Sequence, residues 1–277
     1  MNNAASAPTV KTIGLIAGNG SFPLLLAQEA QKRGDKVIAV ALKEEADAAI
    51  EKYAAQVAWL SIGQLGKIIT FLKENQVTHA IMAGQVKHTQ LFRNIIPDLR
   101  TAKLLGKVLN KKAESVLSTV IQEFESEGIH FLPSTTYLEH WLCGVGLLTK
   151  RRLSTSEEDD IAFGLPLART IAGQDIGQTL VVKDKTVVAV EAMEGTDACI
   201  RRAGEIAGPG CVVIKVARPR QDLRFDIPVI GPKTLESLAK AEIHVLALEA
   251  GKTLLLDKEN LLKDANAAQL SITGLQI

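Results

Sequence analysis

Short apolar runs alternate with helix-like segments through the first half of the chain. The apolar runs, each bounded by small or polar residues, predict strands at 13–17, 36–42, 56–60, 79–83 and 129–132. Apolar residues at helical spacing predict helices at 22–30, 65–72, 98–109 and 114–127. Because strands and helices alternate at short spacing, we expect a Rossmann-like parallel sheet with helices on both faces and right-handed crossovers.

The second half is also predicted to be α/β, with more antiparallel pairing. Two β-type runs separated by Lys183-Asp184-Lys185 predict a hairpin over 179–190. Further strands are expected at 211–216, 225–230, 244–248, 253–256 and 270–272, and helices at 157–172, 198–207, 233–241 and 258–268. The composition shifts between 135 and 152, where aromatic, glycine and polar residues mix and end in a basic run. We therefore expect two domains, 1–140 and 141–277.

The first predicted strand leads into Gly18-Asn19-Gly20, directly before a helix. Glycine allows left-handed backbone angles and lets a ligand approach without meeting a Cβ atom. Ser21 can cap the helix, whose free N–H groups suit a phosphate. The dinucleotide pattern G-x-G-x-x-G fails at its third glycine, where Pro23 stands, and no P-loop lysine follows. Gly18, Asn19 and Gly20 are therefore candidate nucleotide- or phosphate-binding residues, and a tight turn without a ligand is the alternative.

A second turn is expected at the same edge of the sheet. Gly84 and Gln85 directly follow the predicted strand 79–83. Ligands of open parallel sheets bind at the carboxyl ends of the strands, so both residues are candidates for contacts with the polar groups of a nucleotide. The alternative is that turns between strands and helices simply prefer such residues.

Composition narrows the classes of function. Of 277 residues, 47% are hydrophobic and 23% charged, which is typical of a globular protein. A formal net charge of +1 and only 4% aromatic residues argue against nucleic-acid binding. The cysteines Cys143, Cys199 and Cys211 lack metal-binding spacing and are expected to be buried thiols in a reducing compartment. Without a signal-peptide core or a run of membrane-spanning length, the expected location is cytoplasmic.

Carboxylates and arginines gather in the second half. Asp226 stands in an apolar context predicted to be a strand, 225–230, and Arg218, Arg220 and Arg224 precede it. Burying a bare charge is costly, so this aspartate must be paired, hydrogen-bonded or functional. It can hold Mg²⁺ or activate water beside arginines that bind phosphate, or it can form an ion pair that fixes the loop.

The segment 191–197 adds acidic side chains around Gly195 and Thr196. Mg²⁺ typically takes one or two protein carboxylates together with phosphate oxygens, which suits this composition. Thr196 by itself is explained as the cap of the following helix. No hydrolase nucleophile elbow or zinc motif is present, and Glu44 comes a little late for the ribose-binding acid of a nicotinamide dehydrogenase.

Several motifs follow one another in a specific order along nearly the whole chain. They are I-G-L-I-A-G-N-G-S-F-P at 13–23, I-G-Q-L-G-K at 62–67, A-G-Q-V at 83–86, D-I-G-Q at 175–178, A-V-E-A-M-E-G-T-D-A at 189–198 and R-F-D-I-P-V-I-G at 224–231. Together they resemble the LpxI-type UDP-2,3-diacylglucosamine pyrophosphatases of lipid A biosynthesis. The turn at 18–20 departs slightly, with Asn where the family can have Gly, and Asn tolerates left-handed angles.

The resemblance implies Mg²⁺-dependent hydrolysis of UDP-2,3-diacylglucosamine, in which water attacks the α-phosphorus and releases UMP and 2,3-diacylglucosamine 1-phosphate. It also implies a homodimer of two-domain chains in peripheral contact with the inner membrane, and acyl chains held by apolar walls of the second domain. The family's essential aspartate falls on Asp226, the expected catalytic residue and metal ligand. Further substrate-binding residues are expected in the second half: Gln178, Glu194, Gly195, Thr196, Asp197 and Arg224. A Rossmann-type oxidoreductase acting on a nucleotide sugar and a non-catalytic nucleotide- or lipid-binding protein are the alternatives.

Overall fold

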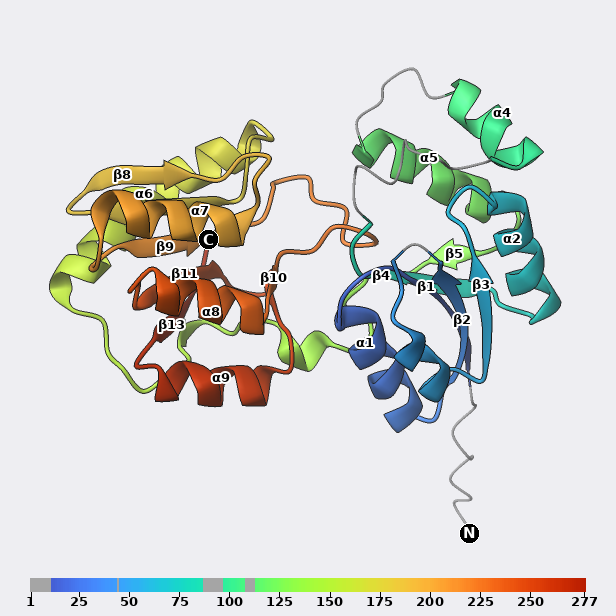
Figure 1. Ribbon diagram of the computed structural model, residues 1–277, viewed down its shortest axis with the longest axis horizontal. Coiled ribbons are helices and arrows are strands. Elements are labelled where there is room, and N and C mark those ends of the chain that lie inside the picture. The colour runs from blue at the N-terminus through green and yellow to red at the C-terminus, as the bar shows by residue number, and fades with distance from the viewer. Residues whose placement is uncertain (1–10, 44, 87–96, 108–112) are drawn as a thin grey trace, which may run out of the picture. The chain divides into compact units, whose positions relative to one another are not determined.

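The computed structural model describes residues 11–43, 45–86, 97–107 and 113–277, and the chain divides into two compact units (Figure 1). The first unit runs up to Tyr137 and takes back the short segment Leu223–Phe225. The second unit comprises Leu138–Asp222 and Asp226–Ile277. Each unit is built around its own sheet and is described by itself.

The first unit contains a wholly parallel sheet, as the sequence predicts, and the structure gives its strand order as β3-β2-β1-β4-β5. Its strands are β1 (Thr12–Ala17), β2 (Lys36–Leu42), β3 (Gln56–Leu60), β4 (His79–Ala83) and β5 (His130–Phe131). The chain leaves β1 towards β2 on one side and later returns to β4 on the other. The carboxyl ends of β1 and β4 are therefore neighbours at the point where the strand order reverses, which is where ligands of such sheets bind.

The helices of the first unit are α1 (Phe22–Lys32), the 3₁₀ turn η1 (Ala48–Lys52), α2 (Leu65–Glu74), α4 (Leu99–Lys107) and α5 (Ala113–Glu125). Most of them bury apolar faces against this sheet, whereas α4 packs against α2 and α5. Residues 108 and 109, predicted to extend α4, lie outside the described residues. The expectation that Ser21 caps α1 is wrong: its backbone is already helical (φ −75°, ψ −17°), and its hydroxyl makes no capping hydrogen bond.

The second unit contains a mixed sheet with the order β6-β13-β11-β9-β7-β8. β9, β11 and β13 pair in parallel, whereas β7 pairs antiparallel with β8 and β9, and β6 pairs antiparallel with β13. Its strands are β6 (Gly146–Leu147), β7 (Thr179–Lys183), β8 (Thr186–Val190), β9 (Val212–Lys215), β11 (Val245–Glu249) and β13 (Ser271–Leu275). The predicted hairpin and the greater antiparallel content are confirmed.

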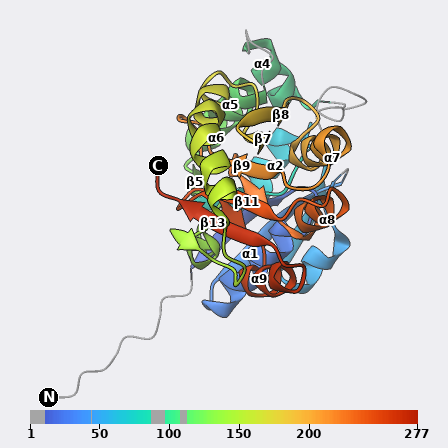
Figure 2. The ribbon, with the colours of Figure 1, turned by 90° about the vertical axis from the view of Figure 1, so that its left-hand side faces the viewer.

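Alternating side chains of these strands feed two apolar clusters, one on each face of the sheet. Leu180 and Val182 of β7 pack in the cluster that includes α6 (Thr155–Gly173), whereas Val181 between them packs in the cluster that includes the helices of the opposite face. Those helices are α7 (Thr196–Ala207), α8 (Pro232–Lys240) and α9 (Lys258–Ala267). Figure 2 shows α6 on one side of the sheet and α7, α8 and α9 on the other.

The strand predicted at 225–230 is wrong for its first half. Only Val229–Ile230 forms a strand, β10, which pairs with β12 (Leu254–Leu255). Leu223–Phe225 turns back to the first unit, where Phe225 packs against the apolar core. Asp226 lies just after this turn, with its side chain 34% exposed, so the expectation that it is buried in a strand is also wrong.

Candidate functional site

The turns after β1 and β4 are joined by backbone hydrogen bonds. Asn19 N–H donates to Gln85 O at 2.8 Å, and Gln85 N–H donates to Asn19 O at 3.0 Å. Gly18 N–H also donates to Ala83 O at 2.8 Å. Gly18, Asn19, Gly84 and Gln85, four of the residues predicted to bind a nucleotide, are thus brought together at the carboxyl edge of the sheet.

Close approach of the two turns explains two of the glycines without a ligand. A Cβ atom on Gly18 would lie 2.7 Å from Gln85 O, and one on Gly84 would lie 2.7 Å from Asn19 O. The interpretation that Gly18 leaves room for a ligand therefore needs correction, because protein backbone fills that room. Gly20 is different: its φ is +99°, and an added Cβ atom would meet nothing within 4 Å. Only Gly20 keeps open space at this turn.

A carboxylate that the sequence analysis missed lies beside the first turn. Asn19 Nδ2 donates to Glu45 Oε2 at 3.2 Å, and Glu45, shortly after β2, is only 9% exposed. Glu44, which was considered as a ribose-binding acid, lies outside the described residues. The signal that could have found Glu45 was an acidic residue shortly after the second strand, but only its neighbour Glu44 was considered.

In the second unit, a buried lysine forms the centre of a polar cluster. Lys215, the last residue of β9, is 5% exposed, and its Nζ donates to Thr196 Oγ1 at 2.6 Å. Glu191 Oε2 lies 4.0 Å from the same Nζ. Burial lowers the pKa of Lys215, while the negative charges of Glu191, Asp197 and Asp226 act in the opposite direction.

Thr196 connects this lysine to the turn between β8 and α7. Its hydroxyl donates to Glu191 Oε1 at 3.2 Å and lies 3.3 Å from the hydroxyl of Thr179. The helix cap itself is Gly195, whose φ of +83° makes the turn, so the interpretation of Thr196 as a simple cap is wrong. The residue predicted to cap a helix instead joins its first turn to a buried lysine and a carboxylate.

Asp226 is fixed by an ion pair. Its Oδ2 accepts from Arg218 Nη1 at 2.7 Å, and Arg218 Nε lies 2.8 Å from Asp175 Oδ1. The backbone N–H of Asp226 donates to Asp222 O at 2.9 Å. The alternative predicted from the sequence, an aspartate–arginine pair in the loop, is therefore present.

The remaining predicted residues have different environments. Glu194 pairs with Arg202 at 2.6 Å, and this hydrogen bond lowers the pKa of Glu194. Asp197 accepts from the hydroxyl of Thr234 on α8 at 2.9 Å. The side-chain oxygen of Gln178 is buried without a hydrogen-bond partner among the residues that the structure describes.

Arg224 belongs to the first unit. Its Nη1 lies 3.0 Å from Glu125 Oε1, and its backbone oxygen accepts from Ser134.

The donor set of the second unit fits Mg²⁺ in kind. Carboxylate and amide oxygens are hard ligands, and Glu191 Oε2 and Gln178 Oε1 are buried oxygens that lack a hydrogen-bond partner within the described ranges. Those ranges contain no group of three or more His, Cys, Asp or Glu side chains arranged to hold a metal. Because Mg²⁺ commonly uses one or two carboxylates and completes its shell with phosphate oxygens and water, this arrangement remains compatible with an ion bound together with substrate.

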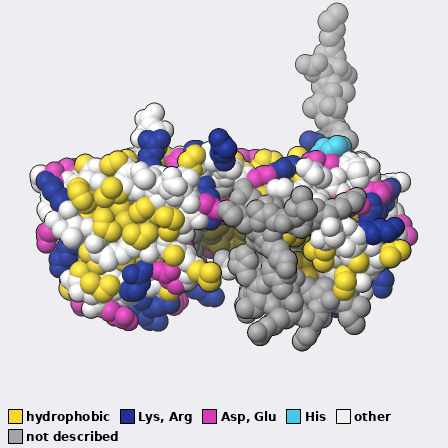
Figure 3. All heavy atoms as spheres, turned by 90° about the horizontal axis from the view of Figure 1, so that it is seen from above, with side chains coloured by type: hydrophobic (Ala, Val, Ile, Leu, Met, Phe, Trp, Pro, Cys, Tyr) yellow, Lys and Arg dark blue, Asp and Glu magenta, His cyan; other side chains and the backbone are white. Residues whose placement is uncertain are grey.

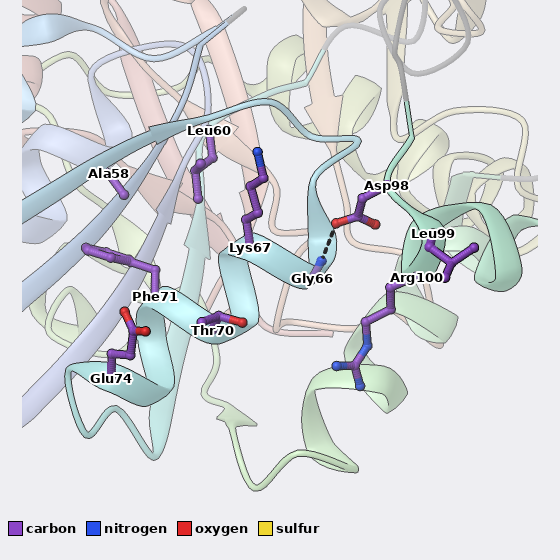
Figure 4. Close-up of a pocket in the computed structure, with 10 residues that line it drawn as sticks. All are labelled: Ala58, Leu60, Gly66, Lys67, Thr70, Phe71, Glu74, Asp98, Leu99 and Arg100. Carbon is purple, nitrogen blue, oxygen red and sulfur yellow. Dashed lines mark hydrogen bonds between the residues drawn. The ribbon is translucent and has the colours of Figure 1, made fainter.

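A groove of about 490 Å³ lies on the first unit, over β3 and between α2 and α4 (Figure 4). Ala58, Leu60 and Phe71 supply apolar wall, and Asp98 accepts from Gly66 N–H at 2.7 Å at the helix start. A second cavity, of about 330 Å³ in the second unit, has mainly charged and small lining residues: Arg201, Gly204, Glu205, Gly208, Lys240, Ala241 and Glu242. The expected apolar acyl pocket of the second domain does not correspond to this cavity.

Comparisons with solved structures give only weak likenesses. The biotin carboxylase domain of 2-oxoglutarate carboxylase from Hydrogenobacter thermophilus matches with 13% identity over 63% of this chain and 35% of that one, with a TM-score of 0.28. An N5-carboxyaminoimidazole ribonucleotide synthetase matches with 15% identity over 73% and 46%, with a TM-score of 0.28. The chain thus spans less than half the length of these proteins, and so weak a likeness carries no argument.

Comparisons of sequence are specific. The LpxI N-terminal domain model matches residues 12–141, and the LpxI C-terminal domain model matches residues 144–273. The UDP-2,3-diacylglucosamine pyrophosphatase LpxI of Caulobacter vibrioides is 32% identical over 96% of this chain and 98% of its own length. Both halves are matched in order and almost completely, so the chain belongs to the LpxI family.

Proposed function

We propose that this chain hydrolyses the pyrophosphate bond of UDP-2,3-diacylglucosamine to UMP and 2,3-diacylglucosamine 1-phosphate. The observation that carries the proposal is the match to a pyrophosphatase of that substrate over 96% of the chain. Two features of the structure support it: paired glycine turns at the strand-order reversal of the first unit, and a cluster of carboxylates and buried lysine in the second. These findings favour the hydrolase over the oxidoreductase and non-catalytic alternatives.

Asp226 is the proposed catalytic residue. Hydrolysis of a pyrophosphate requires water held in line with the phosphorus and compensation of charge on the phosphoryl oxygens. The partly exposed carboxylate can accept the proton of the attacking water, while Arg218 holds it in one orientation at 2.7 Å. The ion pair with Arg218 therefore supports the role of Asp226 as a positioned base, and it also compensates the charge of Asp226 in this loop.

Mg²⁺ is the proposed metal, with Asp226 as a protein ligand, the unpartnered oxygens of Glu191 and Gln178 as further candidate donors, and substrate phosphate oxygens completing the set. When bound, the ion would supply positive charge to the phosphoryl oxygens. The protein's own part is to hold the carboxylate and to orient the substrate. Removal of divalent ions by a chelator should abolish turnover, and added Mg²⁺ should restore it.

The nucleoside is proposed to bind at the paired turns of the first unit. Open space at Gly20 admits a ligand to the backbone there. Glu45 lies at the carboxyl end of β2, where the acidic side chain of dinucleotide-binding sheets accepts hydrogen bonds from ribose hydroxyls. We therefore propose that Glu45 recognises the ribose of the uridine nucleotide.

The substrate is a lipid, and the proposed setting is peripheral contact with the cytoplasmic side of the inner membrane. No helix within the described residues is both long enough and apolar enough to span a membrane. The chain is also proposed to form a homodimer. Phe163 and Leu167 of α6 and Val187 of the edge strand β8 are each more than a third exposed, and Figure 3 shows hydrophobic side chains gathered on the second unit.

A direct test uses purified protein, UDP-2,3-diacylglucosamine and water enriched in ¹⁸O. We expect release of UMP carrying the label, because attack on the α-phosphorus places the new oxygen on the phosphate that stays with uridine. Label in the sugar phosphate would contradict the proposed site of attack. Absence of UMP with Mg²⁺ present would contradict the function itself.

A further inference from the structure

Lys215 places an ionisable amine in an interior position, where a charge is costly unless it is compensated. Its side chain is 7% exposed, and its ammonium group contacts Thr196 Oγ1 at 2.6 Å. Glu191, with 12% of its side chain exposed, supplies a negative charge at 4.0 Å. A hydrophobic side chain of similar length would fill the same space without this cost, so the buried amine requires an explanation.

The contacts of Lys215 lie at the two ends of one turn. Glu191 directly follows β8, and Thr196 begins α7, so both belong to the turn that holds Glu194 and Gly195. The Thr196 hydroxyl, which donates to Glu191 Oε1, closes the turn from the inside. Because Lys215 ends β9 in the sheet below, the ammonium group ties this turn to a rigid element.

We propose that Lys215 is a positioning residue, which acts through the Thr196 hydroxyl to hold the 191–197 turn in the conformation that binds the substrate during hydrolysis. The inference rests on the proposed function for its catalytic consequence. Its structural part, that the ammonium group orders the turn, is independent of the reaction. Nothing in the role requires Lys215 to touch the substrate.

The chain offers matched variants for a test. Lys215→Met keeps the length of the side chain and removes the charge. Lys183→Met is the control, because Lys183 contacts α7 at its other end, where Nζ donates to Ala207 O at 2.7 Å. Thr196→Val removes the bridging hydroxyl, whereas Thr196→Ser keeps it. Thr196 is partly exposed, so its variants provide a test even where Lys215→Met fails to fold.

Steady-state hydrolysis and amide hydrogen exchange are measured on the same proteins. We expect Lys215→Met and Thr196→Val to lower kcat at least about tenfold, since a misplacement of about 1 Å costs up to about 10²-fold. Lys183→Met should stay within about threefold of wild type, and Thr196→Ser, which keeps the hydroxyl, should recover most of the activity that Thr196→Val loses. The double variant Lys215→Met, Thr196→Val should lose no more activity than either single variant, because both substitutions remove the same hydrogen bond between Lys215 and Thr196.

Exchange separates this proposal from the proposed function. Amides of 192–198 should exchange faster in Lys215→Met and in Thr196→Val, while those of β11 stay unchanged. Unchanged exchange in the turn would overturn the proposal whether or not the protein hydrolyses the lipid. Normal kcat in folded Lys215→Met, or in Thr196→Val, would equally overturn it. Failure of the wild-type protein to release UMP would refute the proposed function, and the exchange result would then decide the positioning role alone.

Discussion

Replacement of Gly18 by alanine tests the interpretation of the paired turns most sharply. The added Cβ atom would lie 2.7 Å from Gln85 O and 3.2 Å from the carbonyl carbons of Gln85 and Gly84. Real Cβ atoms do not approach backbone so closely, so one turn must move. Movement breaks the two hydrogen bonds between Asn19 and Gln85, which measure 2.8 and 3.0 Å.

The magnitude follows from these contacts. Two net hydrogen bonds contribute about 1 kcal/mol each, and an extra methyl group forced into a packed site costs about 1–3 kcal/mol. Because relaxation recovers part of the sum, we expect Gly18→Ala to lower the free energy of unfolding of the first unit by about 2–4 kcal/mol. Gly20→Ala creates no clash and carries only the strain of alanine at φ +99°, about 1–2 kcal/mol.

The assay is urea unfolding followed by tryptophan fluorescence. The chain has two tryptophans, Trp59 in β3 of the first unit and Trp141 in the second. A Trp141→Phe background therefore reports on the first unit alone. Calorimetric titration with UMP on the same variants should show the larger loss of affinity for Gly20→Ala, although Gly18→Ala loses more stability. We expect Gly20→Ala to bind UMP at least about tenfold more weakly, because a Cβ atom there occupies the open space.

Two results would refute the reasoning. If Gly18→Ala unfolds within about 0.5 kcal/mol of the wild-type protein, the close contact between the turns does not exist in solution. If Gly20→Ala binds UMP normally, the open space at that position is not used by the nucleotide, and the turn is purely structural.

Three further outcomes are expected. Glu45→Gln should reduce the preference for UMP over 2′-deoxy-UMP, measured by calorimetry, whereas the exposed control Glu51→Gln should keep it; an unchanged preference would exclude the ribose contact. Hydrogen bonds from Lys73 and Arg100 lower the pKa of Glu127 from 4.5 to about 2. These ion pairs should therefore stabilise the first unit fully above pH 4.5, and their contribution should be lost as the pH falls towards 2. A melting temperature of the first unit that does not fall in this pH range would contradict this expectation. Burial raises the pKa of Cys143 to about 11 and of Cys199 to about 12, so neither thiol should react with a disulfide reagent at pH 8 before unfolding, and rapid labelling would contradict their burial.

The regular elements were predictable because their signals are local. Apolar runs of 5–7 residues ended in glycine or polar residues, and the strands of the parallel sheet follow them closely. The hairpin around Asp184 was likewise marked by its polar turn. The strand prediction was wrong at 225–230, where the chain of the second unit returns briefly to the first. Phe225 is apolar because it packs against the core of the first unit, and not because it belongs to a strand.

The candidate site was only partly predictable, since its contacts join residues distant in sequence. The acidic turn and Asp226 were recognised from composition and motif. Lys215 was missed because a lysine at the end of an apolar strand is indistinguishable in sequence from one that ends in solvent; only the fold places it beneath Thr196. The packing role of Gly18 depends on a turn more than 60 residues later, because a Cβ atom added to Gly18 would lie 2.7 Å from Gln85 O.

The central claim is tested most directly by Asp226→Asn, which removes the negative charge and keeps the size of the side chain. UMP release, substrate affinity and melting temperature are compared with those of Asp175→Asn, which removes the other partner of Arg218. We predict at least about 10²-fold slower UMP release for Asp226→Asn, the scale of losing one positioned acid–base group, with substrate affinity and melting temperature retained and Asp175→Asn nearly as active as wild type. Normal turnover in Asp226→Asn at saturating Mg²⁺, together with a lowered melting temperature, would show that the carboxylate is only half of a structural ion pair and would contradict the account.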